Sequence, residues 1–344
     1  MTWRKQTVLL TGGSGVLGRA LIDELAHDFD VVCLRHRTPV GDMRVSEFAG
    51  GFSDPRLGLT TADYRVMVNR VDAIVHSAAA TNWTAAPSDI RATNLEGPTA
   101  LLRLAEDAGV PLYFFSTAFV ANPPADTSFP GAAAYVDSKI EAEQLVREHS
   151  ADTVIVRPSV VVGDSETGHM VTFQGLHRVL GALVRGSVPI LPCQPEAPID
   201  TIPQDVVAGV IGKMLRESIV SGEYWLTAGA NALTAADLME ICHEVAAEAG
   251  LEQITPRYMP GEAVERLLLP LLEDSLPPKM RQMFREFLEF TWLFQTDDVF
   301  PSSLAELGFD AQVTRSALRS ACRNSLQYWA RKKGILLDSR ELVA

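Results

Sequence analysis

The stretch "TVLLTGGSGVLGRALIDELAHDFDVVCLR", residues 7–35, decides the fold. Its first four residues form a short apolar run that stops at a cluster of glycines. Residues 18–28 then have the spacing of an amphipathic helix, and residues 30–35 form a second buried strand. A strand, a glycine-rich turn, a helix and a strand in this order open a doubly wound parallel sheet.

The same alternation continues along the chain. Apolar runs typical of strands follow at 72–78, 112–117 and 153–159, and the segments 94–109 and 134–150 between them have the pattern of helices. Alternation this regular predicts an α/β chain with a Rossmann-type doubly wound parallel sheet.

After about residue 165 the pattern loosens, and helical segments broken by prolines dominate the C-terminal part. We therefore expect two domains. The Rossmann domain comprises residues 1–164 plus 198–228, and a smaller, mostly helical substrate-binding domain comprises residues 165–197 plus 229–344.

Composition limits the class of protein. With 30 basic and 43 acidic side chains, the net charge is −13, which argues against a nucleic-acid-binding surface. The four cysteines lie far apart without metal-ligand spacing, so we expect a reducing, cytoplasmic setting with no disulfide framework. No apolar run approaches the roughly 20 residues of a membrane-spanning helix. We expect a cytoplasmic chain with no metal site and no membrane span.

The glycine cluster "TGGSGVLG" spans residues 11–18. Its glycines suit a tight turn, a close backbone approach to a pyrophosphate and a helix N-terminus that supplies N–H donors. A purely structural turn would use the same glycines, but the strand before and the helix after favour dinucleotide binding. The cofactor contacts expected from this loop are Gly12, Ser14, Gly15, Val16, Leu17 and Gly18.

The end of the second strand predicts which dinucleotide binds. An acidic residue there would bind the ribose 2′-hydroxyl of NAD, whereas an arginine would accept the 2′-phosphate of NADP. This chain has Arg35, His36 and Arg37 and no acid, with Arg19 as a further candidate. Solvated arginines are the alternative interpretation. We expect NADP(H), bound chiefly by Arg35 with help from Arg37.

A tyrosine and a lysine lie four residues apart in "AYVDSK", residues 134–139. On a helix, Tyr135 and Lys139 point the same way. A free phenol titrates near pH 10, and a neighbouring ammonium would lower its pKa toward the range where it can transfer a proton. Ser116 and Thr117 at the end of a predicted strand offer hydroxyls that would hold a substrate oxygen.

In this combination the chain resembles the extended short-chain dehydrogenase/reductase family. Within that family it is most similar to the branch of fatty acyl-CoA reductases and the terminal thioester reductases of carboxylic acid reductases and peptide synthetases. The resemblance covers roughly the first 210 residues, and the motifs that carry it are "TGGSGVLG", "HSAAAT", "TNLEG", "FFSTAFV", "YVDSK" and "RPSVVVGDS".

The resemblance implies a role for each matching residue. Tyr135 would be the general acid in reduction, Lys139 would lower its pKa and bind the nicotinamide ribose, and Thr117 would bind the substrate oxygen. Further residues would lie along the cofactor: Ala78, Ala79, Asn94, Ser116, Pro158, Ser159 and Val161.

One position departs from the family pattern. Relatives often carry an aspartate after the third strand that binds the adenine amino group, whereas Gly51 and Phe52 stand there in this chain. Adenine recognition is therefore expected from Ser53, Asp54 or backbone groups.

The residues and the resemblance together predict an NADPH-dependent reductase that transfers hydride to a carbonyl carbon. The expected substrate is an acyl thioester, bound to a carrier protein or to coenzyme A, giving an aldehyde or alcohol. An NADP(H)-dependent ketone or aldehyde reductase, an alcohol dehydrogenase and an NAD(P)-dependent epimerase remain open. A non-catalytic nucleotide-sensing regulator is disfavoured, because it would not need Tyr135, Lys139 and Thr117. Either a monomer or a homodimer is compatible with the sequence.

The segment 277–294, rich in methionine and aromatic residues, has two interpretations. It would either gate a lipophilic substrate channel or, more simply, pack one helix face on the core.

Overall fold

The computed structural model describes residues 4–83, 85–123, 130–149, 151–173, 175–268, 270, 277 and 299–337. All of segment 277–294 except Pro277 therefore lies outside the described residues. The chain forms two compact units, which are described separately. Unit 1 comprises Met1–Ser159, Gln204–Leu226 and Ser302–Phe309, and unit 2 comprises Val160–Pro203, Thr227–Pro301 and Asp310–Ala344.

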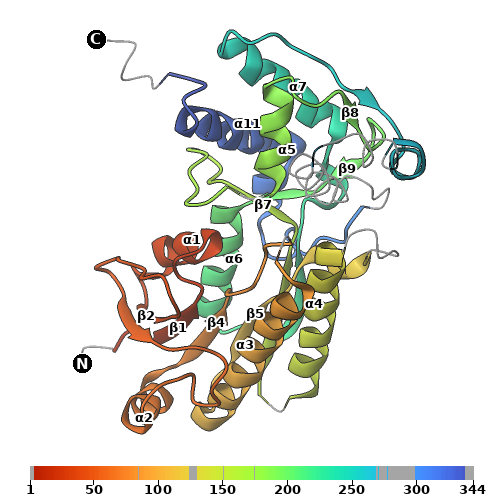
Figure 1. Cartoon of the computed structure of the whole chain (residues 1–344). Helices are drawn as coiled ribbons and strands as arrows, with labels where there is room; N and C mark the ends of the chain where they lie inside the picture. Colours follow the sequence, from red (N-terminus) through yellow and green to blue (C-terminus); the bar gives the residue numbers. More distant parts are fainter. Residues whose placement is uncertain are drawn as a thin grey trace. The chain divides into compact units, whose positions relative to one another are not determined.

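Unit 1 is built on a seven-stranded sheet in which every pair of neighbouring strands is parallel (Figure 1). In order across the sheet, its strands are β11 (Gly222–Leu226), β6 (Thr153–Pro158), β5 (Leu112–Phe115), β4 (Ala73–His76), β1 (Thr7–Thr11), β2 (Asp30–Arg35) and β3 (Ser46–Ala49). The central strands β1, β4 and β5 are buried at every residue, which fits a sheet covered on both faces. The predicted α/β class and parallel sheet are confirmed.

Helices cover both faces of this sheet. On one face, α3 (Pro87–Ala108) packs beside α4 (Pro130–Glu148) and beside α2 (Thr61–Arg70) (Figure 1). Their apolar side chains share one core with those of the strands, including Leu101, Ala142, Phe114 and Ile155. Helices α1 (Val16–Leu25) and α6 (Gln204–Arg216) pack against each other. The right-handed crossover rule places α1 on the opposite face from α3, because β2 and β5 lie on opposite sides of the β1–β4 pair.

The strand order reverses between β1 and β4. The chain leaves β1 toward β2 on one side, and it leaves β4 toward β5 on the other side. The connections that follow these two strands therefore diverge and leave room at the carboxyl edge of the sheet, where open α/β sheets bind their ligands. The glycine loop follows β1, and "HSAAAT" begins at the last residue of β4.

Unit 2 combines short strand pairs with helices. Parallel pairs join β7 (Val160–Val162) to β10 (Thr201–Pro203) and β8 (Ile190–Leu191) to β13 (Arg257–Tyr258), and an antiparallel pair joins β9 (Pro198–Ile199) to β12 (Leu233–Thr234). Helices α5 (Gly175–Val184), α7 (Ala235–Glu248) and α11 (Arg315–Lys332) pack together. Shorter helical turns occur at η1 (Ala118–Ala121) of unit 1 and, in unit 2, at η2 (Gly229–Asn231), α8 (Gly261–Ala263), η3 (Val264–Leu268) and η5 (Asp310–Val313).

The described part of the chain holds no helix with the length and hydropathy that a membrane span requires. Within the same residues, no cluster of three or more histidine, cysteine or acidic side chains could hold a metal ion. All four cysteines are free and buried.

Candidate active site

The glycine loop is a turn that larger residues would not fit. Gly12 has φ +77°, and a Cβ there would lie 2.7 Å from the backbone nitrogen of Ala78. A Cβ on Gly18 would lie 2.0 Å from the carbonyl oxygen of Gly12, so α1 can begin this close to the loop only with glycine at that position. Gly15 differs, because a Cβ there would meet only the Gly12 oxygen, at 3.2 Å. Its other sides are open, as a backbone that receives a ligand requires.

The N-terminus of α1 is available to an anion. The N-cap is Gly15, which has no capping side chain, and the first turn carries no acidic residue. The positive end of the helix dipole and the first amide groups are therefore not neutralised by the helix itself. This cradle fits the pyrophosphate of a dinucleotide.

Polar bonds tie the end of β1 to the end of β4. The hydroxyl of Thr11 bonds to Nδ1 of His76 at 2.7 Å, and the hydroxyl of Ser77 donates to the Thr11 carbonyl at 2.8 Å. Burial, with a smaller contribution from the charge of Lys139, lowers the pKa of His76 to about 3, so the ring is neutral. These bonds fix the backbone that leads into Ala78 and Ala79, both of which are half-buried.

The loop after β2 is organised by a carboxylate that the sequence did not single out. Glu47, on β3, accepts the backbone N–H groups of Val40 at 3.1 Å and Gly41 at 2.9 Å. Nε of Arg35 lies 3.4 Å from the same carboxylate. Arg35 is thus held at the end of β2 by an ion pair, whereas Arg37 is exposed.

The positions expected to bind adenine are also defined. The ring of Phe52 meets the ring of His76 edge-on, with centroids 5.5 Å apart. Ser53 and Asp54 are exposed, and the Asp54 carboxylate accepts the backbone N–H of Arg56 at 2.7 Å.

Tyr135 and Thr117 form a buried hydroxyl pair. The two side chains are hydrogen-bonded, and 9% of Tyr135 and 4% of Thr117 is exposed. Burial raises the pKa of Tyr135 to about 12, and the Thr117 hydrogen bond opposes this increase only in part. The resemblance implied that Lys139 lowers this pKa, whereas in this structure burial dominates and the pKa is raised. The ring of Trp83, which the sequence did not single out, lies beside Tyr135 with centroids 6.1 Å apart.

Lys139 lies one helical turn from Tyr135 on α4. Its Nζ donates to the carbonyl oxygen of Phe115 at 2.8 Å and lies 5.1 Å from the ring centroid of Phe114. Burial lowers the pKa of Lys139 to about 8, and the negative charge of Glu143 acts in the opposite direction. The ammonium is thus held against the end of β5, the strand that leads into Thr117.

Asn94 connects the β4 loop to the helix that carries Tyr135. Its side-chain oxygen accepts the N–H of Ala80 at 2.8 Å, and its amide nitrogen donates to the hydroxyl of Ser138 at 2.9 Å. Ser138 in turn donates to the carbonyl of Tyr135 at 2.7 Å. Asn94 therefore links the loop that follows β4 to helix α4 and fixes the distance between them.

Two buried hydroxyls at strand ends have no hydrogen-bond partner among the described residues. They are Oγ of Ser116, after β5, and Oγ of Ser159, after β6. Buried polar groups are normally satisfied, so each of these groups is an available partner for a bound molecule. Together with the cradle at α1, they fit a dinucleotide that lies along the carboxyl edge of the sheet.

Most of the residues predicted for the site lie in unit 1, at the carboxyl ends of β1, β2, β4, β5 and β6 or on α3 and α4. Pro158 is the last residue of β6. Val161 belongs to β7 of unit 2, where it pairs with Ile202. Glu47, Trp83 and Ser138 are the neighbours that sequence reasoning missed.

Comparisons of sequence and of structure show which known proteins this chain is similar to. A family model for an NAD-binding domain, described as male sterility protein, matches residues 33–211. The highly reducing polyketide synthase calA of Penicillium decumbens is 32% identical over 187 residues, which is 46% of this chain and 6% of that protein. The chain thus spans only a small part of the length of this curated relative.

Solved structures share the fold. The terminal R domain from the myxalamid PKS-NRPS biosynthetic pathway superimposes with a TM-score of 0.74 at 23% identity, over 98% of this chain and 93% of that one. A thiolation-reductase di-domain from an archaeal non-ribosomal peptide synthetase superimposes with a TM-score of 0.67 at 14% identity, over 96% of this chain and 76% of that one.

Proposed function

The chain belongs to the male sterility protein family, and we propose that it is an NADPH-dependent reductase of acyl thioesters bound to a carrier protein or to coenzyme A. It is an oxidoreductase with an NAD(P)-binding domain. The observation that carries the proposal is the hydrogen-bonded pair of Tyr135 and Thr117, with Lys139 one helical turn away, at the same sheet edge as the glycine loop.

In the proposed reaction, the bound nicotinamide supplies a hydride to the carbonyl carbon of the thioester. Thr117 and Tyr135 hold the carbonyl oxygen between their hydroxyls, and Tyr135 gives its proton to that oxygen as negative charge develops on it. The resulting thiohemiacetal collapses when the C–S bond breaks, the sulfur leaves with the bonding pair and a proton, and an aldehyde remains. One thioester, one NADPH and one proton thus give one aldehyde, one thiol and one NADP⁺.

Tyr135 is protonated at neutral pH, as the acid of a reduction must be, and burial raises its pKa further, to about 12, and so makes the isolated phenol a weaker acid. Lys139 would contribute a positive charge on the same helix face that favours the phenolate left behind. The proposal assigns it a second role as a donor to the nicotinamide ribose.

The preference for NADPH is supported by the residues after β2. Arg35 and Arg37 offer guanidinium groups, which bind a phosphate by charge-assisted hydrogen bonds. Within the described ranges, Glu47 is the carboxylate that pairs with Arg35, and it contacts the loop backbone as well. We propose that Glu47 orients Arg35 for the 2′-phosphate and that the exposed Arg37 adds a second contact.

The choice of a thioester substrate is supported by the comparisons. The matched relative is a polyketide synthase, and the similar solved structures are a terminal R domain and a thiolation-reductase di-domain. A carrier-bound acyl group is the substrate class that these names suggest for this chain. Unit 2 is the proposed substrate-binding domain.

Loss of NADPH absorbance by purified chain tests the proposal. Octanoyl-coenzyme A and octanal are supplied separately, and a Tyr135→Phe variant is assayed in parallel. We expect the wild-type chain to oxidise NADPH when the thioester is supplied, and we expect the Tyr135→Phe variant not to do so. Oxidation with octanal alone would instead support a carbonyl reductase, and nucleotide binding without any turnover would support the nucleotide-sensing alternative.

A further inference from the structure

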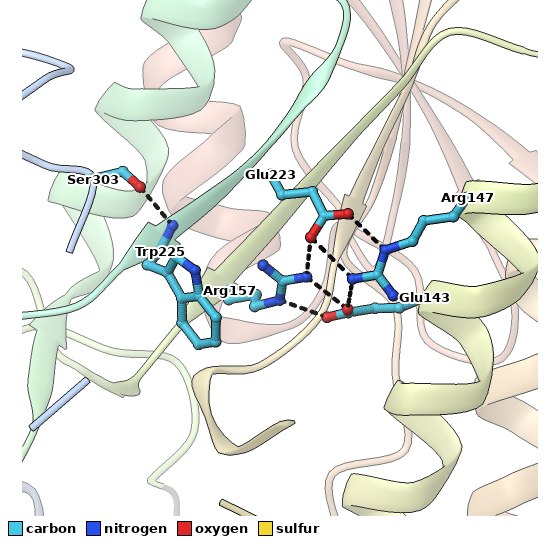
Figure 2. Close-up of polar contacts among 6 residues, drawn as sticks. All are labelled: Glu143, Arg147, Arg157, Glu223, Trp225 and Ser303. Atoms are coloured by element: carbon cyan, nitrogen blue, oxygen red, sulfur yellow. Dashed lines mark hydrogen bonds and ion pairs between the residues drawn. The ribbon is translucent and has the colours of Figure 1, made fainter. Parts of the chain in front are cut away.

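Four charged side chains form one ion-pair cluster between α4, β6 and β11 of unit 1 (Figure 2). Glu143 and Arg147 extend from α4, Arg157 from β6 and Glu223 from β11. Arg157 lies two residues after Ile155 on β6, so the two side chains point to the same face of the sheet. Ile155 belongs to the core shared with α4, and Arg157 therefore points to the α4 face.

The inner pair of this cluster is fully enclosed. Nε and Nη2 of Arg157 donate to the two carboxylate oxygens of Glu143 at 2.8 and 2.7 Å. Only 4% of each side chain is exposed. On its other side, the Arg157 guanidinium lies 4.6 Å from the ring of Trp225 (Figure 2). A two-point bond of this kind fixes the orientation of both groups.

The outer pair completes the contacts of the inner one. Arg147 donates to Glu143 at 2.6 Å and to Glu223 at 2.6 and 2.9 Å, and Arg157 also bonds to Glu223. Arg147 and Glu223 are 42% and 40% exposed, so they form the solvent-facing rim. The pKa of Glu223 is lowered to about 2, chiefly by its hydrogen bonds from Arg147. Both oxygens of Glu143 are thus occupied by arginines, which leaves it no free oxygen for proton transfer.

Glu143 lies on the helix face that carries the proposed catalytic residues. Tyr135, Lys139 and Glu143 follow one another at intervals of four residues, so they line one side of α4. Among the described residues, Lys139 faces the Phe114 ring and the Phe115 carbonyl of β5 and the neutral His76 of β4.

We propose that Glu143 is a positioning residue for Lys139: its carboxylate, fixed by Arg157 and Arg147, is the counter-charge that keeps the buried ammonium protonated and in place. The inference rests on the proposed function only for what the charged Lys139 then does. It adds the reason why a lysine buried beneath the cofactor site remains a cation.

Desolvation is the reason why Lys139 needs a counter-charge. A buried ammonium loses its hydration and tends to release its proton, unless a fixed negative charge lies near it. Glu143 is one helical turn from Lys139, and the bidentate bond to Arg157 prevents the carboxylate from turning away. Glu223 contacts the same two arginines but extends from β11, an edge strand that β6 separates from the β5 backbone that Lys139 contacts.

Urea unfolding of the free chain tests the inference without nucleotide or substrate, so its failure is separate from failure of the proposed function. The chains compared are wild type, Glu143→Gln, Lys139→Met and the double variant, from about pH 7 to about pH 10. Glu223→Gln is the matched control, because it removes a carboxylate from the same cluster at the rim.

Glu143→Gln is expected to raise the unfolding equilibrium constant more at neutral pH than at alkaline pH. This additional effect at neutral pH disappears as Lys139 loses its proton. Between neutral and alkaline pH, the effect of Glu143→Gln on the unfolding equilibrium constant should shrink by about tenfold for each unit by which Glu143 raises the lysine pKa. In the Lys139→Met background the effect of Glu143→Gln should not change with pH, and the effect of Glu223→Gln should not change with pH in any background.

A penalty for Glu143→Gln that is the same at every pH, with or without Lys139, would overturn the inference and leave the cluster as a purely structural clamp. Glu143→Gln also leaves Arg157 short of a charge partner and can fail to fold. The same comparison is then made between Arg157→Met and Arg157→Met with Glu143→Gln. A pH-dependent difference between these two supports the inference, and a constant difference overturns it.

Discussion

Tyr135 carries its proton at neutral pH, as any phenol does, and burial raises its pKa further. Its pKa of about 12 leaves the phenol protonated through the whole neutral range, and Thr117 is the hydroxyl that opposes this effect. A reductase needs a proton donor at the carbonyl oxygen, and a buried phenol that keeps its proton until charge develops beside it meets that need.

Replacing Tyr135 by phenylalanine removes the proton donor and little else. We expect turnover to fall by about 10²- to 10⁴-fold, the range for loss of a general acid, with nucleotide affinity little changed. Tyr113→Phe is the matched control, because its buried hydroxyl donates at 2.9 Å to the carbonyl of Ile219, away from Thr117. Equal losses in both variants would contradict the assignment of Tyr135.

Lys139 makes stability depend on pH. Its pKa of about 8 in the folded chain is below its ordinary 10.5, so the unfolded chain holds more protons between these values and stability rises with pH across that window. The penalty, ~3 kcal/mol, is fully present below pH 8. Lys139→Met should therefore be more stable than wild type at neutral pH, with the gain lost by about pH 10.5. Chemical unfolding across this range measures it, and a gain that does not change with pH would contradict the lowered pKa.

Arg35 should distinguish the two dinucleotides. Charge-assisted hydrogen bonds contribute ~1.5–3 kcal/mol, so Arg35→Ala is expected to weaken NADPH binding by roughly 10- to 100-fold and to leave NADH binding unchanged. Fluorescence titration with each nucleotide measures both affinities. Equal losses for NADPH and NADH would show that Arg35 does not read the 2′-phosphate.

At the scale of the element, the loop between β1 and α1 separates two uses of glycine. Gly18 lets the helix pack against the loop, whereas Gly15 leaves open space at the helix N-terminus. Gly18→Ala should reduce both the melting temperature and nucleotide affinity, because its Cβ would lie 2.0 Å from a backbone oxygen. Gly15→Ala should keep most of the stability and lose nucleotide binding. Thermal unfolding and nucleotide titration of the two variants check this, and the reverse pattern would contradict the proposed cradle.

The sequence predicted elements that bury a continuous apolar face and missed those that do not. Residues of β1, β4 and β5 are buried throughout, and their apolar runs are visible without a structure. The four residues of β3 are only partly buried at most, and the one buried residue of α2 is Met67, so neither element shows an apolar period. Helix α3 begins at Pro87, earlier than the expected residue 94. The sequence pattern missed its first turn because that turn is mostly exposed.

At the scale of the whole chain, the site residues that are close in sequence could be predicted, and those joined only by the sheet could not. The glycine loop and the pair Tyr135 and Lys139 are local patterns. The contact between Arg35 and Glu47 depends on the pairing of β2 with β3, which places Glu47 beside Cys33. The bond of Glu143 to Arg157 depends equally on how α4 packs on β6, although the spacing of Glu143 from Lys139 was visible in "YVDSKIEAE".

We propose above that this chain cleaves a thioester by reducing it, and the two products of that reaction can be measured together. Free thiol and NADPH are followed together while the purified chain acts on octanoyl-coenzyme A. We expect one thiol released for each NADPH oxidised if the product is the aldehyde, or one for every two if reduction continues to the alcohol, and neither signal with Tyr135→Phe. Oxidation of NADPH without release of thiol, or release of thiol without NADPH, would contradict the proposal.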